Sequence, residues 1–103
     1  MSRVNEITNS DESDYFIANH PRCVIFFGSV RCPHCRNMTP IYNELANKYT
    51  SVSFAHVETS LVEVDNLDGV PVFVGYKDGV PIDVVLGARS DALNNMIQQK
   101  LLI

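Results

Sequence analysis

Residues 24–36 read Val24-Ile25-Phe26-Phe27-Gly28-Ser29-Val30-Arg31-Cys32-Pro33-His34-Cys35-Arg36. The stretch begins as an apolar run of strand length, passes through a Gly-Ser turn and places two cysteines at the start of a helical pattern. At this spacing both thiols lie within one helical turn and are close enough to form a disulfide. The helix dipole and the free backbone N–H groups of the first turn favour a thiolate there. The pattern therefore predicts thiol–disulfide chemistry at Cys32 and Cys35.

The composition is that of an ordinary globular protein. The chain has 103 residues, of which 46% are hydrophobic and 19% charged, and we expect a single domain over residues 1–103. The formal net charge of -4 argues against general nucleic-acid binding, which needs a basic face. The longest apolar run, residues 23–27, is too short for a membrane span, and the polar N-terminus lacks the core of a signal peptide. We therefore expect a cytoplasmic protein.

The cysteine count favours a redox site over a structural one. Three cysteines, two of them in a tight pair, do not form the disulfide framework of a small secreted domain. The alternative is a metal site, but a closed zinc site needs about four ligands. Only Cys23, His20 and His34 could join the pair, and the chain has no second Cys-x-x-Cys. We expect no metal, and we expect Cys23 to be a small buried hydrophobic residue.

Two helical patterns flank the central apolar run. Asn9 and Glu12 have the spacing of a capping box, which opens a helix that His20-Pro21 ends. From Pro33 onward, apolar residues recur in steps of three and four, which is typical of an amphipathic helix. Pro40 lies inside this second helix and is expected to kink it, because proline removes an internal hydrogen bond.

The strand patterns are shorter and are bounded by turn residues. They cover residues 4–7, 23–27, 52–57, 70–76 and 80–86. The last two are joined by Lys77-Asp78-Gly79 and predict an antiparallel hairpin, and the first is expected to be an edge strand. Residues 59–67 indicate a short helix or an irregular crossover, and Ser90 indicates the N-cap of a last helix. This order predicts an α/β fold: a central mixed β-sheet of four to five strands, flanked by three to four helices.

Several motifs resemble those of the thioredoxin family, in the family's order along the chain. They are Cys32-Pro33-His34-Cys35 with Pro40 after it, Gly69-Val70-Pro71, Lys77-Asp78-Gly79 and Gly87-Ala88-Arg89-Ser90. The resemblance implies the thioredoxin fold and a dithiol–disulfide oxidoreductase that acts on protein disulfides. It implies a redox-active Cys32–Cys35 disulfide and no bound cofactor. It also implies electrons from a separate thioredoxin reductase-like partner. We expect a monomer, and from the charge and the short apolar runs we expect that it binds neither nucleic acid nor membrane.

The resemblance also assigns roles within the cysteine motif. Cys32 would be the exposed nucleophile, and Cys35 would resolve the mixed disulfide. Pro33 would keep the first helical turn rigid. Thioredoxins usually carry Gly-Pro between their cysteines, whereas Pro33-His34 resembles the bacterial periplasmic disulfide oxidases. A histidine there can stabilise the Cys32 thiolate, so we expect a lowered Cys32 pKa and a more oxidising disulfide than in a Gly-Pro thioredoxin.

A second set of residues is expected to contact the substrate. The resemblance implies a cis bond before Pro71, which leaves the backbone of Val70 free to pair with an extended substrate segment. Gly87 would allow a close approach of the backbone beneath the groove that holds the substrate segment, or would simply end its strand. Arg31 is placed with this group, and with Arg36 it adds positive charge near the thiolate.

Three further positions depart from the family's pattern. Arg31 replaces the aromatic residue before the first cysteine, Gly28 replaces a tryptophan, and Phe26 replaces a buried aspartate. In the family that acid is implicated in taking the proton from the second cysteine. His56 on the next strand is one candidate to take over that role, although a partly exposed strand histidine is the plainer interpretation.

Two other functions remain open from the residues alone. A glutaredoxin-like enzyme that uses glutathione would share Cys-Pro-x-Cys and Val-Pro, but the chain has no Gly-Gly pair for the glutathione carboxylate. The helix before residue 20, the Lys77-Asp78-Gly79 turn and Gly87-Ala88 fit thioredoxin better. The third possibility is a binding subunit with the thioredoxin fold, in which the dithiol is incidental.

Overall fold

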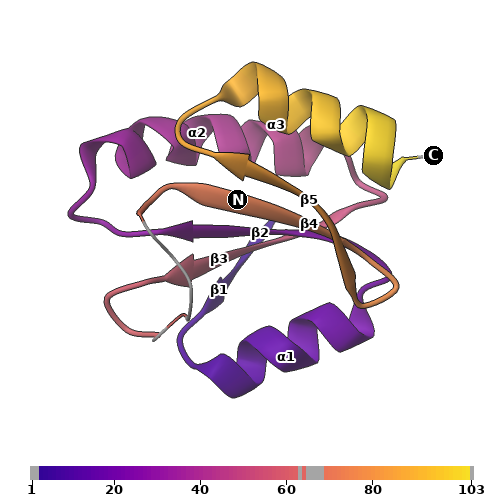
Figure 1. Ribbon diagram of the computed structural model, residues 1–103, viewed down its shortest axis with the longest axis horizontal. Helices are drawn as coiled ribbons and strands as arrows, with labels where there is room; N and C mark the ends of the chain where they lie inside the picture. Colours follow the sequence, from indigo (N-terminus) through magenta and orange to yellow (C-terminus); the bar gives the residue numbers. More distant parts are fainter. Residues whose placement is uncertain (1–2, 63, 65–68, 103) are drawn as a thin grey trace.

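The computed structural model describes residues 3–62, 64 and 69–102, and it contains one five-stranded mixed sheet (Figure 1). The strands are β1 (Val4–Ile7), β2 (Arg22–Gly28), β3 (Ser53–Glu58), β4 (Val72–Lys77) and β5 (Val80–Leu86). Their order across the sheet is β1-β3-β2-β4-β5, with β1 and β2 parallel to β3. β4 is antiparallel to both β2 and β5. The predicted mixed sheet, its edge strand β1 and its β4–β5 hairpin are therefore confirmed.

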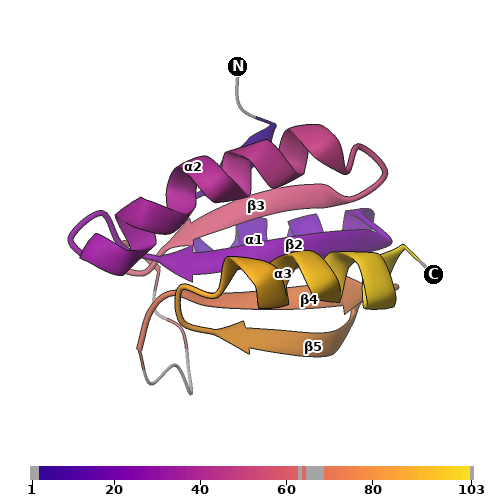
Figure 2. The ribbon, with the colours of Figure 1, turned by 90° about the horizontal axis from the view of Figure 1, so that it is seen from above.

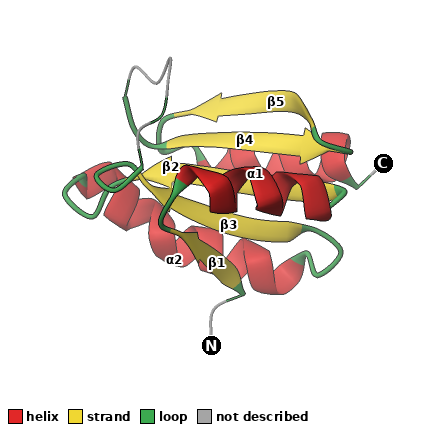
Figure 3. Ribbon diagram, turned by 90° about the horizontal axis from the view of Figure 1, so that it is seen from below, coloured by secondary structure: helices red, strands yellow, loops and turns green. Residues whose placement is uncertain are grey.

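Helices cover both faces of the sheet. They are α1 (Ser10–Asn19), α2 (Pro33–Lys48) and α3 (Ser90–Met96), and α3 continues as one π-helical segment, Ile97–Leu101. α2 and α3 lie side by side on one face (Figure 2), and α1 crosses the other face (Figure 3). Within the described ranges, no helix is long and apolar enough to cross a bilayer. The chain thus has the three-layer α/β arrangement that the sequence predicts.

The sheet separates two hydrophobic cores, one on each face, and β2 contributes side chains to both. Val24 and Phe26 face α2 and α3, whereas Cys23, Ile25 and Phe27 face α1. Because successive side chains of a strand point to opposite faces, a strand covered on both sides reads as a continuous apolar run. All five of these residues are at most 8% exposed. The end of this strand leads directly to the two cysteines.

Local sequence signals set the helix boundaries. The Asn9 side chain accepts a hydrogen bond from the backbone N–H of Glu12 at 2.9 Å and donates one to the Glu12 carboxylate at 2.7 Å, which completes the predicted cap. Pro33 occupies the first turn of α2, where its missing N–H costs nothing. Pro40 lies inside the same helix, and the Thr39 hydroxyl donates to the carbonyl of Cys35 at 3.0 Å one turn earlier.

The strands begin and end within two residues of the predicted ranges, and two further points differ from the sequence prediction or fall outside the described residues. Ser90 is the first residue of α3 rather than its N-cap, and Arg89 at the cap makes no side-chain capping bond. The reason is a tight turn: Gly87 has φ 85° and accepts a hydrogen bond from Arg89 N–H at 2.9 Å, which starts the helix one residue early. Of the segment 59–67, residues 59–62 form hydrogen-bonded turns, while residues 63 and 65–67 lie outside the described part.

Tyr42 joins two strands through its buried hydroxyl. Its oxygen lies 2.9 Å from the carbonyl of Val24 and 2.7 Å from the carbonyl of Ala55, so α2 is bonded to β2 and β3 at once. We expect Tyr42→Phe to lower the free energy of unfolding by about 1–2 kcal/mol, because the substitution leaves buried carbonyl groups with one partner fewer. Urea denaturation would measure the loss. Tyr15→Phe is the control because Tyr15 is 70% exposed, and equal losses in the two variants would contradict the prediction.

Candidate active site

The two cysteines sit at the junction of β2 and α2. Residues 29–31 turn away from the strand, and Cys32 N–H donates to the carbonyl of Ser29 at 3.1 Å. Cys32 is the N-cap of α2, and its Sγ accepts a hydrogen bond from the backbone N–H of Cys35 at 3.2 Å. Both cysteines are free thiols; Cys32 is half-buried and Cys35 is 2% exposed. The junction therefore presents one thiol to solvent and keeps the other inside.

The environment of Cys32 favours its thiolate. Desolvation raises the pKa of this thiol, but hydrogen bonds from the Cys35 thiol and from the backbone N–H groups of Cys35 and His34 lower it. The positive charge of Arg36 lowers it further, so the net shift of the Cys32 pKa is downward from the usual value of 9.0. The direction is the one expected for a cysteine at a helix N-terminus.

Cys35 is shifted the opposite way. Burial raises the pKa of its thiol to about 11, with further contributions from the hydrogen bond it donates to Cys32 and from the negative charges of Cys32 and Glu58. The backbone at Ser29 opposes this shift only in part. Of the two thiols, Cys32 is therefore the one that loses its proton more readily.

Distant segments of the chain complete the surface around Cys32. The Cys32 thiol lies 3.8 Å from the carbonyl oxygen of Val70, which is 38 residues further along the chain. The Val70–Pro71 peptide bond is cis, as the resemblance implies. Gly87 N–H donates to the carbonyl of Pro71 at 2.8 Å, so the end of β5 supports this segment from behind. The structure therefore brings together Val70, Pro71 and Gly87, three of the residues predicted to contact substrate.

A family comparison fits this geometry. The model of the thioredoxin family matches residues 4–99 of the chain. The chain belongs to the thioredoxin family.

Individual thioredoxins match over nearly their whole length. Thioredoxin-3 of Dictyostelium discoideum is 29% identical, with 98% of this chain and 100% of that protein covered. The thioredoxin of Coprinus comatus is 31% identical, with 95% of this chain and 98% of the relative covered. A solved structure of Plasmodium falciparum thioredoxin has a TM-score of 0.89 at 30% identity, covering 94% of this chain and 99% of that one. The fold is therefore the thioredoxin fold, and the protein is a protein disulfide oxidoreductase.

Thioredoxins use a redox-active cysteine pair and no prosthetic group, and they are reduced by thioredoxin reductase. In the described ranges, no three His, Cys, Asp or Glu side chains are arranged to hold a metal ion.

Arg31 and His34 are both exposed beside the pair. Of the two flanking arginines, Arg36 is the one whose charge lowers the Cys32 pKa, whereas Arg31 bonds through its backbone N–H to the Ser29 hydroxyl at 3.2 Å. His34 acts on Cys32 through its backbone N–H. The role given to its imidazole stays a prediction.

Phe26 and Gly28 both depart from the family pattern, and together they form one structural feature. Phe26 is 2% exposed, and its ring stacks on Phe73 with a centroid separation of 4.6 Å. A Cβ atom added to Gly28 would lie 2.6 Å from the Phe26 ring and 3.2 Å from the Cys35 Sγ. The phenylalanine at position 26 therefore fills space that a side chain at position 28 would need, so Phe26 in this position requires the glycine.

His56 lies beside this ring rather than against a thiol. Its ring centroid is 5.0 Å from that of Phe26, and its Nδ1 is 2.7 Å from a carboxylate oxygen of Glu6 on β1. These partners are those of a partly exposed strand histidine, and a role in proton transfer stays a prediction.

Glu58 was missed by sequence reasoning. It ends β3, is only 9% exposed, and adds negative charge near Cys35. Strand alternation could have found it, because Phe54, His56 and Glu58 must share the face that α2 covers.

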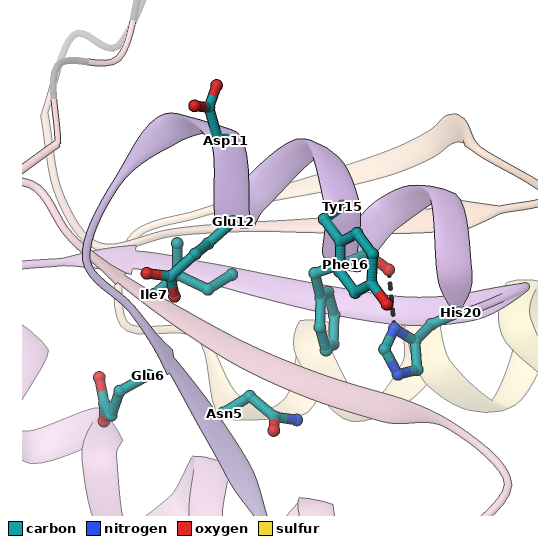
Figure 4. A pocket seen from close by; sticks show the side chains of 8 residues that line it. All are labelled: Asn5, Glu6, Ile7, Asp11, Glu12, Tyr15, Phe16 and His20. Carbon is teal, nitrogen blue, oxygen red and sulfur yellow. Dashed lines mark hydrogen bonds between the residues drawn. The ribbon is translucent and has the colours of Figure 1, made fainter.

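A hollow of about 500 Å³ lies between β1 and α1 (Figure 4). Ile7, Tyr15 and Phe16 supply its apolar part, and the acidic residues Asp11 and Glu12 also line it. The ring of His20, the last of its lining residues along the chain, stacks on Phe16 at 4.2 Å. The hollow lies on the α1 side of the sheet, so it is separate from the dithiol.

Proposed function

We propose that this thioredoxin reduces protein disulfides through Cys32 and Cys35, as a single domain over residues 1–103. The observation that carries the proposal is the asymmetry of the pair: a half-exposed thiol with a lowered pKa beside a buried thiol with a pKa of about 11. A thiolate is the attacking species in thiol–disulfide exchange. Cys32 therefore attacks the substrate disulfide first, and Cys35 reacts only in the second step.

The reaction has two exchange steps. The Cys32 thiolate forms a bond to one sulfur of the substrate disulfide and expels the other sulfur as a thiolate. Cys35 then loses its proton, attacks the Cys32 sulfur and releases the second substrate thiolate. The substrate gains two electrons, the chain is left with a Cys32–Cys35 disulfide, and the first expelled thiolate can take the Cys35 proton. An external thioredoxin reductase-like partner then returns the pair to the dithiol.

The substrate is proposed to lie across Val70 and Pro71. The carbonyl of Val70, only 3.8 Å from the Cys32 sulfur, can accept a backbone hydrogen bond from an extended segment of the client. Gly87 supports the Val70–Pro71 segment through its hydrogen bond to the Pro71 carbonyl. The exposed Arg31 lies next to Cys32, where the substrate would approach. We further propose that the protein works as a monomer. We place it in the cytoplasm, because an odd number of cysteines with a single tight pair suits a reducing compartment.

Insulin reduction with thioredoxin reductase, run beside a glutathione-coupled disulfide assay, tests the function. Activity with the reductase alone is the expected result. Activity only with glutathione would favour a glutaredoxin-like enzyme, and activity in neither assay would favour a binding subunit. Either of the last two outcomes would overturn the proposal.

His34 is proposed to tune the pair through its side chain. We expect His34→Pro to raise the Cys32 pKa, and thus to need a higher pH for the same rate of alkylation by iodoacetamide, because it removes the imidazole and the backbone N–H donor together. We also expect the reduction potential to fall by about 30 mV or more, since a less stable thiolate makes the disulfide a weaker oxidant.

His34→Ala separates the two effects, because it removes the ring and keeps the N–H. His20→Asn, far from the pair, is the control. If His34→Ala leaves both the alkylation profile and the potential unchanged, the imidazole has no tuning role.

A further inference from the structure

We propose that Glu58 is a positioning residue of the dithiol loop, whose carboxylate clamps the turn before Cys32 to the end of β3 and holds a negative charge beside Cys35. The inference rests on the roles proposed above for the two cysteines. It concerns a residue for which the sequence offered no role.

Both carboxylate oxygens of Glu58 bind loop groups. Oε1 accepts a hydrogen bond from the backbone N–H of Val30 at 2.9 Å. Oε2 accepts one from the backbone N–H of Ser60 at 3.2 Å and one from its hydroxyl at 2.8 Å. The Ser29 hydroxyl is a further hydrogen-bond partner. One side chain therefore fixes the loop that carries Cys32 and the turn that follows β3, and hydrogen bonds to a charged acceptor are stronger than those between neutral groups.

The strand register places this carboxylate near Cys35. Glu58 is paired with Gly28 across the parallel β2–β3 ladder, and paired residues point to the same face of a sheet. The Cys35 sulfur lies over Gly28 on that face, because a Cβ atom at position 28 would be only 3.2 Å from it. Thr59 N–H, donating to the carbonyl of Gly28 at 3.0 Å, holds the two strand ends together.

The Glu58 carboxylate stays charged, so it acts as a positioning group and not as a general base for the Cys35 thiol. Desolvation raises the pKa of its carboxyl, but the hydrogen bonds from Ser60, Val30 and Ser29 outweigh this and lower the pKa below the usual 4.5. A carboxylate this acidic is a poor acceptor for the proton of a thiol, since a useful base has a pKa near the working pH. Its permanent charge instead helps to keep Cys35 protonated until the mixed disulfide has formed.

The Glu58→Gln variant tests the proposal in the full chain, and Glu44→Gln is its matched control. Glu44 lies on the exposed face of α2, so the control removes the same charge by the same substitution. We expect the amide of Val30 to exchange with solvent about fivefold faster in Glu58→Gln, because a charged acceptor becomes a neutral one. We also expect the Cys35 pKa, measured by NMR of its β-carbon, to fall. Glu44→Gln should change neither quantity.

The proposal is overturned if Val30 exchange and Cys35 titration match those of the Glu44→Gln control. It is overturned equally if Glu58→Gln lowers thermal stability while both readouts stay unchanged, since Glu58 would then be only structural. Neither readout requires a redox substrate, so failure here is distinguishable from failure of the proposed function in the insulin assay.

Ser60→Ala keeps the proposal testable if Glu58→Gln does not fold. This variant removes one hydroxyl donor from Oε2 and keeps the carboxylate charge. We expect the Glu58 pKa to rise and Val30 exchange to increase by about twofold, because the carboxylate is held less firmly. Unchanged values for both would overturn the proposal.

Discussion

Cys32→Ser is expected to abolish insulin reduction completely. A serine hydroxyl does not ionise in the working pH range, whereas Cys32 has a lowered pKa and is the half-exposed thiol of the pair. Without the first attack no mixed disulfide forms, so Cys35 has nothing to resolve. The measurement is the rate of NADPH oxidation in the coupled assay with thioredoxin reductase.

Cys35→Ser is expected to stop the reaction one step later. Its Cys32 thiolate still attacks the substrate, so a mixed disulfide with the client accumulates and is visible on a non-reducing gel. Cys23→Ser is the control for the loss of a thiol, because Cys23 is 0% exposed and burial raises its pKa to about 11. We expect Cys23→Ser to retain activity. Accumulation of a mixed disulfide in Cys32→Ser instead would reverse the two roles.

Phe26→Asp is expected to unfold the protein or to remove most of its stability. The substitution restores the acid that thioredoxins usually carry, but in this chain position 26 belongs to a cluster of buried aromatic rings. The Phe26 ring stacks on Phe73 at 4.6 Å and meets Tyr42 edge-on at 5.2 Å. Truncating such a ring costs about 3–5 kcal/mol, and burying an unpaired carboxylate adds to this. Small domains are stable by only about 5–15 kcal/mol, so urea denaturation should show a large loss.

Phe26→Leu is the control for Phe26→Asp. It removes the ring but keeps an apolar side chain, and we expect it to cost about 1–2 kcal/mol. If Phe26→Asp were as stable as Phe26→Leu, the space left by the ring would have to admit water or a partner for the carboxylate. The expectation that a carboxylate at position 26 is buried without a partner would then be wrong.

The fold could be predicted from the sequence because the signals that specify it are local. The continuous apolar run of β2, the Asn9 cap, the helical spacing after Pro33 and the Asp78-Gly79 turn each act within a few residues. Such preferences can be identified without knowing the rest of the molecule. The boundary at Ser90 was wrong by one residue, because the Gly87 turn, which hydrogen-bonds to Pro71, starts α3 early.

The dithiol, the strand and helix that carry it, and its place in the order of elements all follow from residue patterns along the chain. The groups that surround the two sulfurs depend on how the chain folds in three dimensions. Val70 reaches Cys32 across 38 residues, Phe26 takes the space over Gly28, and Glu58 binds the loop through the β2–β3 register. The contacts of Val70 and Glu58 join groups that are far apart along the chain, and only the folded sheet brings them together. Phe26 and Gly28 share one strand, but the groups that pack over them, Phe73 and Cys35, come from other elements. Which side chains meet is set by strand register, and no local preference along the chain encodes it.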